Sequence, residues 1–172
     1  MSSVNLSVFV GKNFACVKIA GRANFSFSPD FKTLLGELVL NGYGHFIIDL
    51  SDCVLMYSTF LGILSGFGLK LNPAAAPDKC GIELLNPNPR VTELLENLGT
   101  LHLFKMQAGA LKLPDDVQTC VPESINPTHE QITRTSLEAH QTLMAVNPDN
   151  VARFKDVTQF LAEDLKNIEN CR

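Results

Sequence analysis

The sequence predicts an α/β fold in which a mixed sheet of about five strands is covered by helices and is followed by a C-terminal helical extension. Three observations support this prediction. Two alternating apolar segments open the chain, helix-like and strand-like segments then alternate up to residue 106, and two more helical segments follow a polar stretch. We therefore divide the chain into a domain at residues 1–106, a linker at 107–125 and a helical extension at 126–172.

The opening segments predict a β-hairpin. Apolar and polar side chains alternate over residues 6–10 and again over residues 14–20, as in strands that bury one face. Residues 11–13, Gly-Lys-Asn, have the composition of a tight turn. The hairpin therefore supplies the first two strands of the predicted sheet.

An amphipathic helix and a buried strand are predicted next. Ser28 is the expected N-cap and Pro29 the first helical residue, and apolar residues then recur at helical spacing from Phe31 to Val39. Residues 45–50 form a short, nearly continuous apolar run. Such a run is typical of a strand that is buried on both faces of a sheet.

The segment at residues 53–69 carries no charge, and it predicts a strand end, a loop and then a buried helix from residue 59. It is shorter than the roughly 20 residues that span a bilayer, so we expect no membrane segment. Gly62 and Gly66 lie one helical turn apart. We expect them to let this helix approach the sheet closely.

The remaining elements complete the domain and add the extension. Residues 80–85 predict a strand, 91–98 a helix and 101–106 a last strand. After the polar linker, Asn126-Pro127 and Asn147-Pro148 each combine an Asn N-cap with a Pro at the first helical position. Because two isolated helices of this kind are not stable in water, their apolar stripes must pack on the domain, on each other or on another chain.

Composition excludes several functions. The chain has 14 Lys and Arg against 18 Asp and Glu, for a formal charge of -4, so it lacks the basic surface that nucleic acids require. The N-terminal residues do not resemble a secretory signal, and we expect a cytoplasmic protein. The five cysteines are too widely spaced for a disulfide or zinc framework. Cys16, Cys53 and Cys80 are expected to be small core residues.

No catalytic residue, metal or cofactor is predicted. No serine lies in a G-x-S-x-G motif, no H-E-x-x-H motif occurs, and the four histidines are scattered along the chain. The glycine-rich segments do not follow the strand-to-helix order of nucleotide-binding loops. We therefore expect no enzyme.

Ser58 and Thr59 stand where the buried helix is expected to begin. Unpaired N–H groups and a partial positive charge at a helix N-terminus favour anions. Either residue could serve only as an N-cap. Alternatively, Ser58 could accept a phosphate, whose charge of about -1.5 to -2 would disturb a docked partner.

Two segments around Ser58 carry a motif, residues 46–53 (F-I-I-D-L-S-D-C) and residues 57–64 (Y-S-T-F-L-G-I-L). They resemble the signature of the STAS domains, the family of anti-sigma factor antagonists, which is an I-I-D-L-S strand followed by D-S-[ST]-G-L-G-[VIL]-L. The order of elements from residue 4 to about residue 106 is also similar. The resemblance implies a STAS-like fold, and Asp49 matches the strand aspartate of the family.

The resemblance also implies a function. A STAS regulator would be a cytoplasmic bacterial signalling phosphoprotein that acts in transcription regulation by binding an anti-sigma kinase of the GHKL ATPase type. Phosphorylation of Ser58, with Thr59 as the second candidate, would release that partner. The implied partner-binding residues are Asn24, Tyr57, Ser58, Thr59 and Phe60.

Three positions depart from the family pattern. Tyr57 replaces the aspartate before the serine, Phe60 replaces a glycine, and Asn24 occupies an acidic position of the neighbouring loop. Two carboxylates are therefore missing from the site that a kinase would engage. Phe60 could belong to the core or be an exposed contact.

Two alternative functions follow from the same sequence. The protein could be a constitutive assembly module that forms a homodimer or scaffold through its C-terminal helices without phosphoregulation. It could also be a small-molecule carrier in which those helices cover an apolar pocket, although no residue identifies a ligand.

Overall fold

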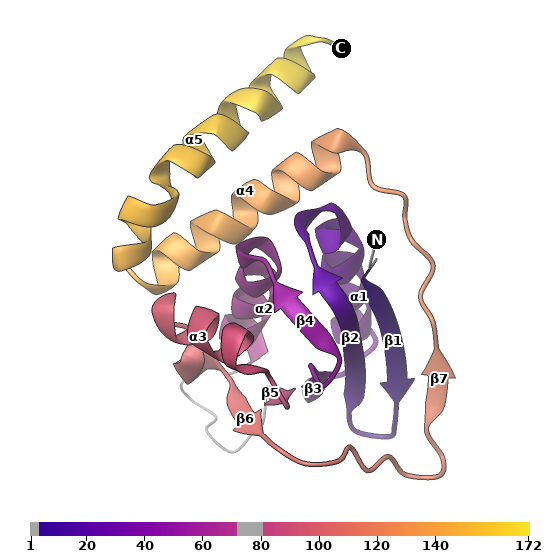
Figure 1. Ribbon diagram of the computed structural model, residues 1–172. Coiled ribbons are helices and arrows are strands. Elements are labelled where there is room, and N and C mark those ends of the chain that lie inside the picture. Colours follow the sequence, from indigo (N-terminus) through magenta and orange to yellow (C-terminus); the bar gives the residue numbers. More distant parts are fainter. Residues whose placement is uncertain (1–3, 72–80) are drawn as a thin grey trace.

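The computed structural model describes residues 4–71 and 81–172 (Figure 1). The described strands are β1 (Asn5–Val10), β2 (Ala15–Ala23), β3 (Phe46–Asp49), β4 (Cys53–Met56), β5 (Ile82–Leu85), β6 (Lys105–Gln107) and β7 (Gln118–Cys120). The α-helices are α1 (Ser28–Leu40), α2 (Ser58–Leu71), α3 (Pro89–Asn97), α4 (His129–Val146) and α5 (Asp149–Asn170). Short 3-10 helices lie at Phe25–Phe27 and Leu101–Leu103.

The strands form one mixed sheet in the order β6-β5-β3-β2-β1-β7. The hairpin of β1 and β2 is antiparallel, whereas β2, β3, β5 and β6 run parallel. β4 pairs in parallel with the end of β2, after a shift in register between Gly21 and Arg22. The predicted α/β fold class with a helical extension is therefore confirmed.

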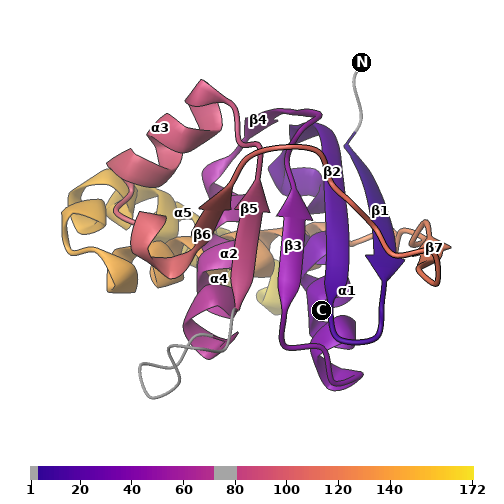
Figure 2. The same cartoon turned by 90° about the horizontal axis from the view of Figure 1, so that it is seen from below.

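Helices α1, α2, α4 and α5 form successive layers on one side of the sheet. Figure 1 shows α1 and α2 next to the strands, α4 across these two helices, and α5 along α4, farthest from the sheet. The connection from β6 to β7 crosses the strands on the opposite side (Figure 2). No helix among the described residues is long and apolar enough to cross a membrane.

The core forms between the sheet and the first helical layer. Phe46 and Ile48 on β3 are buried, as the predicted apolar run requires, and Phe31 on α1 is fully buried with them. Cys16 and Cys53 are buried core residues, as expected, whereas Cys80 lies outside the described residues. Burial of such side chains supplies the main driving force for this fold.

Two predicted strands are wrong in their details. Residues 101–106 were expected to form one strand, but Leu101–Leu103 is a 3-10 helix and only Lys105–Gln107 pairs with β5. The segment Cys53–Met56 is a separate strand and not the end of the preceding one. A turn held by the Asp49 carboxylate, which accepts hydrogen bonds from the N–H and hydroxyl of Ser51, separates β3 from β4.

The expected linker at 107–125 also contains structure that its composition did not indicate. Gln118–Cys120 forms β7, which pairs antiparallel with Val8–Val10 of β1 at the edge of the sheet. A strand of three residues that are all exposed shows no alternation of apolar and polar side chains from which it could be predicted. The linker is therefore anchored to the domain.

The predicted helix caps differ from the observed ones by one or two residues. Ser28 is the first residue of α1 and not its N-cap, and its hydroxyl donates to the carbonyl of Phe25. α4 begins at His129 with Thr128 as the N-cap of a capping box, so Asn126 is not the cap. At α5 the N-cap is Pro148, so the expected cap Asn147 lies one residue earlier, although its side chain accepts from the N–H of Asp149.

Gly62 and Gly66 face α4, so the expectation that they serve the packing of α2 on the sheet is wrong. A Cβ atom at Gly62 would lie 2.4 Å from the carbonyl oxygen of Ala139 on α4. One at Gly66 would lie 3.8 Å from Cγ2 of Thr142. The missing side chain at Gly62 therefore allows the backbones of α2 and α4 to touch.

This contact predicts a position-specific effect of adding one methyl group. We expect Gly62→Ala to lower the free energy of unfolding by about 1–3 kcal/mol, because the new Cβ overlaps the α4 backbone. Gly36→Ala on α1 is the matched control, since nothing lies within 4 Å of its added Cβ. The control should be neutral or stabilising by up to about 1 kcal/mol. Urea denaturation of both variants measures the difference, and equal effects would contradict the contact.

Candidate functional site

The candidate site forms where β2 and β4 end and α1 and α2 begin. Ala23 on β2 pairs with Met56 on β4, and the N–H of Tyr57 donates to the carbonyl of Ala23 at 3.0 Å. This pairing places Asn24 beside Tyr57 and Ser58. The Asn24 side chain accepts a hydrogen bond from the N–H of Ser26 and so fixes the short loop that leads to α1.

Ser58 is the first residue of α2, and its hydroxyl contacts a histidine from the extension. Oγ of Ser58 lies 2.9 Å from Nε2 of His140 on α4. Nδ1 of His140 lies 2.7 Å from the carbonyl oxygen of Ser136. Because a carbonyl oxygen can only accept, Nδ1 carries the proton, and Nε2 accepts from the Ser58 hydroxyl.

His140 is buried, which keeps it neutral. Its side chain contacts the edge of the Phe154 ring on α5, with ring centroids 4.9 Å apart. Burial lowers the pKa of His140 below the ordinary value of 6.5, and the hydrogen bond to the Ser136 carbonyl opposes this effect only in part. The neutral ring can therefore hold the Ser58 hydroxyl in one direction.

Sequence reasoning did not identify His140 as a site residue. The signal available was its helical spacing, because Ser136, Ala139, His140 and Leu143 fall on one face of the predicted helix, and all four are buried. This spacing places His140 on the inward face. The spacing cannot identify Ser58 as the hydrogen-bond partner of His140, because Ser58 lies 82 residues away in the chain.

Two residues implied as partner contacts are buried. Phe60 is fully buried and stacks on Phe31, with ring centroids 4.8 Å apart and an interplanar angle of 14°. Thr59 is 4% exposed. Of the two roles open for Phe60, the structure therefore assigns the core, and neither side chain offers a surface to a partner in this conformation.

The exposed part of the site is apolar. Tyr57 is 41% exposed, and Phe25, which follows Asn24, is 52% exposed. Phe25 was not among the residues that the sequence indicated, because a single aromatic residue in a loop carries no pattern. Exposed aromatic side chains beside a serine suit contact with another protein.

Asp49, the residue that matches the strand aspartate, has a structural role. It is buried and accepts from Ser51, whose hydroxyl in turn accepts from the side-chain amide of Asn86. Burial, and secondly the negative charge of Asp49, raise the pKa of the Cys16 thiol to about 12. Cys16 is therefore an uncharged core thiol.

The site contains no recognisable metal centre. No group of three or more His, Cys, Asp or Glu side chains within residues 4–71 and 81–172 could hold a metal ion. Four surface cavities in the described part of the chain are lined by residues other than Ser58 and His140. The chemistry present at the site is thus a hydroxyl, an imidazole and exposed aromatic rings.

Comparison with known proteins identifies the fold. It is the STAS-like fold of the anti-sigma factor antagonists. The crystal structure of an anti-sigma factor antagonist from Mycobacterium paratuberculosis matches with a TM-score of 0.53 and 20% identity, over 61% of this chain and 86% of the other. The anti-sigma factor antagonist SpoIIAA in its unphosphorylated form matches with a TM-score of 0.51 and 17% identity, over 63% and 89%. Neither a protein-family model nor a curated protein sequence matches the chain.

The buried imidazole predicts a pH dependence of stability. The folded protein favours neutral His140, whereas the unfolded chain binds a proton near pH 6.5. The stability that His140 contributes is therefore present above about pH 6.5 and is lost as the pH falls toward its lowered pKa. We expect urea denaturation to show this loss between about pH 7.5 and about pH 5.5.

Two variants separate His140 from other groups that titrate. His140→Asn should remove most of the pH dependence in that window, whereas His102→Asn, at an exposed position, should retain it. A wild-type stability that stays constant over this range would contradict the proposed state of His140.

Proposed function

We propose that this protein is a non-catalytic signalling regulator of the anti-sigma factor antagonist type. It binds a protein partner, an anti-sigma factor or serine kinase, through the surface around Asn24, Tyr57 and Ser58. The observation that carries the proposal is the position of Ser58 at the start of α2, in a fold shared with anti-sigma factor antagonists. Exposed Tyr57 and Phe25 beside it support a protein contact.

Phosphorylation of Ser58 is the proposed means of release, with Thr59 as a second candidate that is less accessible because it is buried. A phosphate of charge about -1.5 to -2 is stabilised at a helix N-terminus. It would also remove the hydroxyl proton that Ser58 donates to His140. The absence of carboxylates at Tyr57 and Asn24 removes two negative charges that would repel this phosphate.

Calorimetric titration tests this function. The titrants are the ATPase domains of anti-sigma-type kinases from the source organism, each purified separately. We expect Tyr57→Ala to weaken binding by about tenfold or more, as truncation of a central aromatic contact does. Ser58→Asp should weaken binding while leaving the circular dichroism spectrum unchanged.

The matched control is Leu40→Ala. Leu40 is 88% exposed and ends α1, at the opposite end of that helix from Asn24. Its replacement should leave the affinity unchanged. If no kinase domain binds the wild type or any variant, the proposed function is wrong.

The second candidate function is a constitutive assembly module. Its support is an exposed apolar surface on α5 formed by Phe160, which is 70% exposed, and Val157, which is 40% exposed and lies one helical turn away. If this surface forms a homodimer, light scattering of the wild type should give twice the mass of one chain, and Phe160→Glu should give a monomer. Leu40→Glu is the control, and a monomeric wild type at about 100 μM would exclude this function.

A further inference from the structure

The helix that follows Ser58 is covered by the C-terminal extension of the same chain. We propose that α4 and α5 form an intramolecular cap over the face of α2 that begins at Ser58, and that a protein partner reaches this face only when the cap is released. This inference rests on the proposed function, because it concerns regulation of the same surface.

The cap contacts α2 at three successive helical turns of one face. Ser58, Gly62 and Gly66 are spaced four residues apart and therefore lie on the same side of α2. Ser58 donates to His140, Gly62 touches the α4 backbone at Ala139, and Gly66 faces Thr142. A partner cannot dock on these residues of α2 while α4 remains in place.

A buried polar side chain holds the other end of the cap on the domain. Asn150, at the start of α5, is fully buried, and its side-chain amide donates to the carbonyls of Leu98 and Leu143. Leu98 is the C-cap of α3, so the Asn150 side chain joins the corner between α4 and α5 to the domain. The Oδ1 atom of Asn150 is buried without a hydrogen-bond partner among the described residues. An unpaired buried acceptor lowers the stability of the docked state.

The buried surface of the cap is unusually polar for a core. Most of the buried residues on α4 carry a polar group, and only Ala139 and Leu143 are apolar. The buried polar residues of this helix are Thr133, Thr135, Ser136 and His140. On α5 the only buried residues are Asn150 and Leu165. Surfaces of this composition resemble those of transient contacts and are released at lower cost than an apolar core.

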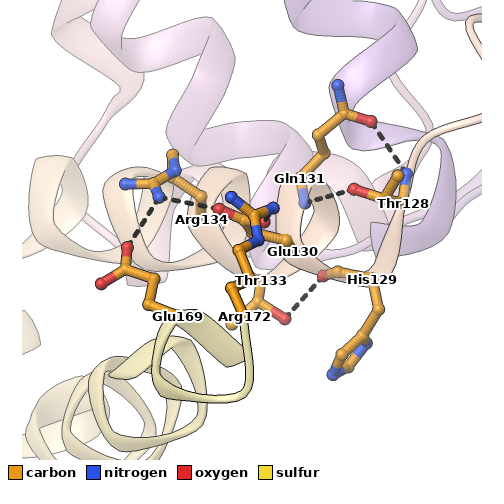
Figure 3. A network of polar contacts seen from close by, with 8 residues as sticks. All are labelled: Thr128, His129, Glu130, Gln131, Thr133, Arg134, Glu169 and Arg172. Atoms are coloured by element: carbon orange, nitrogen blue, oxygen red, sulfur yellow. Dashed lines mark hydrogen bonds and ion pairs between the residues drawn. The ribbon is translucent and has the colours of Figure 1, made fainter. Parts of the chain in front are cut away.

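Ion pairs join the two helices of the cap to each other. Arg134 on α4 pairs with Glu130 of the same helix and with Glu169 near the end of α5, and Arg172 also contacts Glu130 (Figure 3). The segment before α4 is fixed separately, since the Asp30 carboxylate accepts from Ser124 and from the N–H of Ile125. Figure 1 shows this segment reaching α4 from the edge of the sheet at β7. Release therefore requires loss of the contacts between the cap and the domain, which include the ion pair of Lys32 on α1 with Glu138 on α4.

Hydrogen exchange of the full-length protein tests whether the cap opens separately. We expect the amides of α4 to exchange faster than those of β2 and β3. Asn150→Asp has the same shape but loses both donors, and it should accelerate exchange in α4 by at least about tenfold while leaving β3 unchanged. Asn167→Asp, the same substitution at an exposed position of α5, should have no effect. Exchange of α4 only together with β3 would overturn the proposal.

The affinity for the kinase domains then tests what the cap controls. A cap that must open reduces the apparent affinity by the fraction of open molecules. Asn150→Asp should therefore bind at least about threefold more tightly than the wild type and the Asn167→Asp control. Faster exchange in α4 with equal affinity in all three proteins would overturn the cap and leave the proposed function intact. Absence of binding by all three would overturn the proposed function and the cap's role with it.

A disulfide lock provides the opposite test and does not depend on destabilising the protein. Gly66→Cys and Thr142→Cys lie on facing positions of α2 and α4, in a background where Cys80, Cys120 and Cys171 are replaced by serine. The oxidised protein should lose at least about tenfold in affinity, and reduction of the same sample should restore it. Equal affinity of the oxidised and reduced forms would overturn the proposal.

Discussion

The contact between α2 and α4 is the constraint on which the arrangement of the C-terminal third depends. The helices touch through their backbones at Gly62 and Ala139, and this approach brings His140 within hydrogen-bond distance of Ser58. A side chain at position 62 would separate the helices and break the hydrogen bond. One glycine thus connects the packing of the extension to the state of the candidate site.

The candidate site lacks the carboxylates that the resemblance to STAS domains leads one to expect. The positions at which the resemblance leads one to expect carboxylates hold Tyr57 and Asn24, and the neighbour of the serine hydroxyl is a buried neutral imidazole. Burial disfavours a positive charge on His140, whereas the N-terminus of α2 favours a negative charge on Ser58. Phosphorylation of Ser58 would remove the hydroxyl proton that Ser58 donates to His140. Docking of the extension and modification of Ser58 are therefore linked.

The domain shares its fold with anti-sigma factor antagonists, whereas the C-terminal extension adds a surface that covers part of this domain. About two-fifths of the chain lies outside the match, and a segment of that size can cover a helix of the domain. The polar contacts of His140 and Asn150 give the docked position a defined geometry, whereas few apolar side chains hold it in place. Polar residues thus define the position in which the extension docks on the domain, whereas the apolar residues determine how tightly it docks.

The sequence by itself determined the elements that depend on local periodicity and on residues close in the chain. The hairpin, α1, β3, α2, α3 and the two C-terminal helices follow from apolar spacing, and the register of the Ser58 motif predicted the fold. Only the tertiary structure decided what lies opposite these elements. The pairing of β7 with β1, the burial of Phe60 against Phe31 and the contact of Ser58 with His140 join residues far apart in the chain. Periodicity shows which face of a helix is buried, but it contains no information about the surface that buries it.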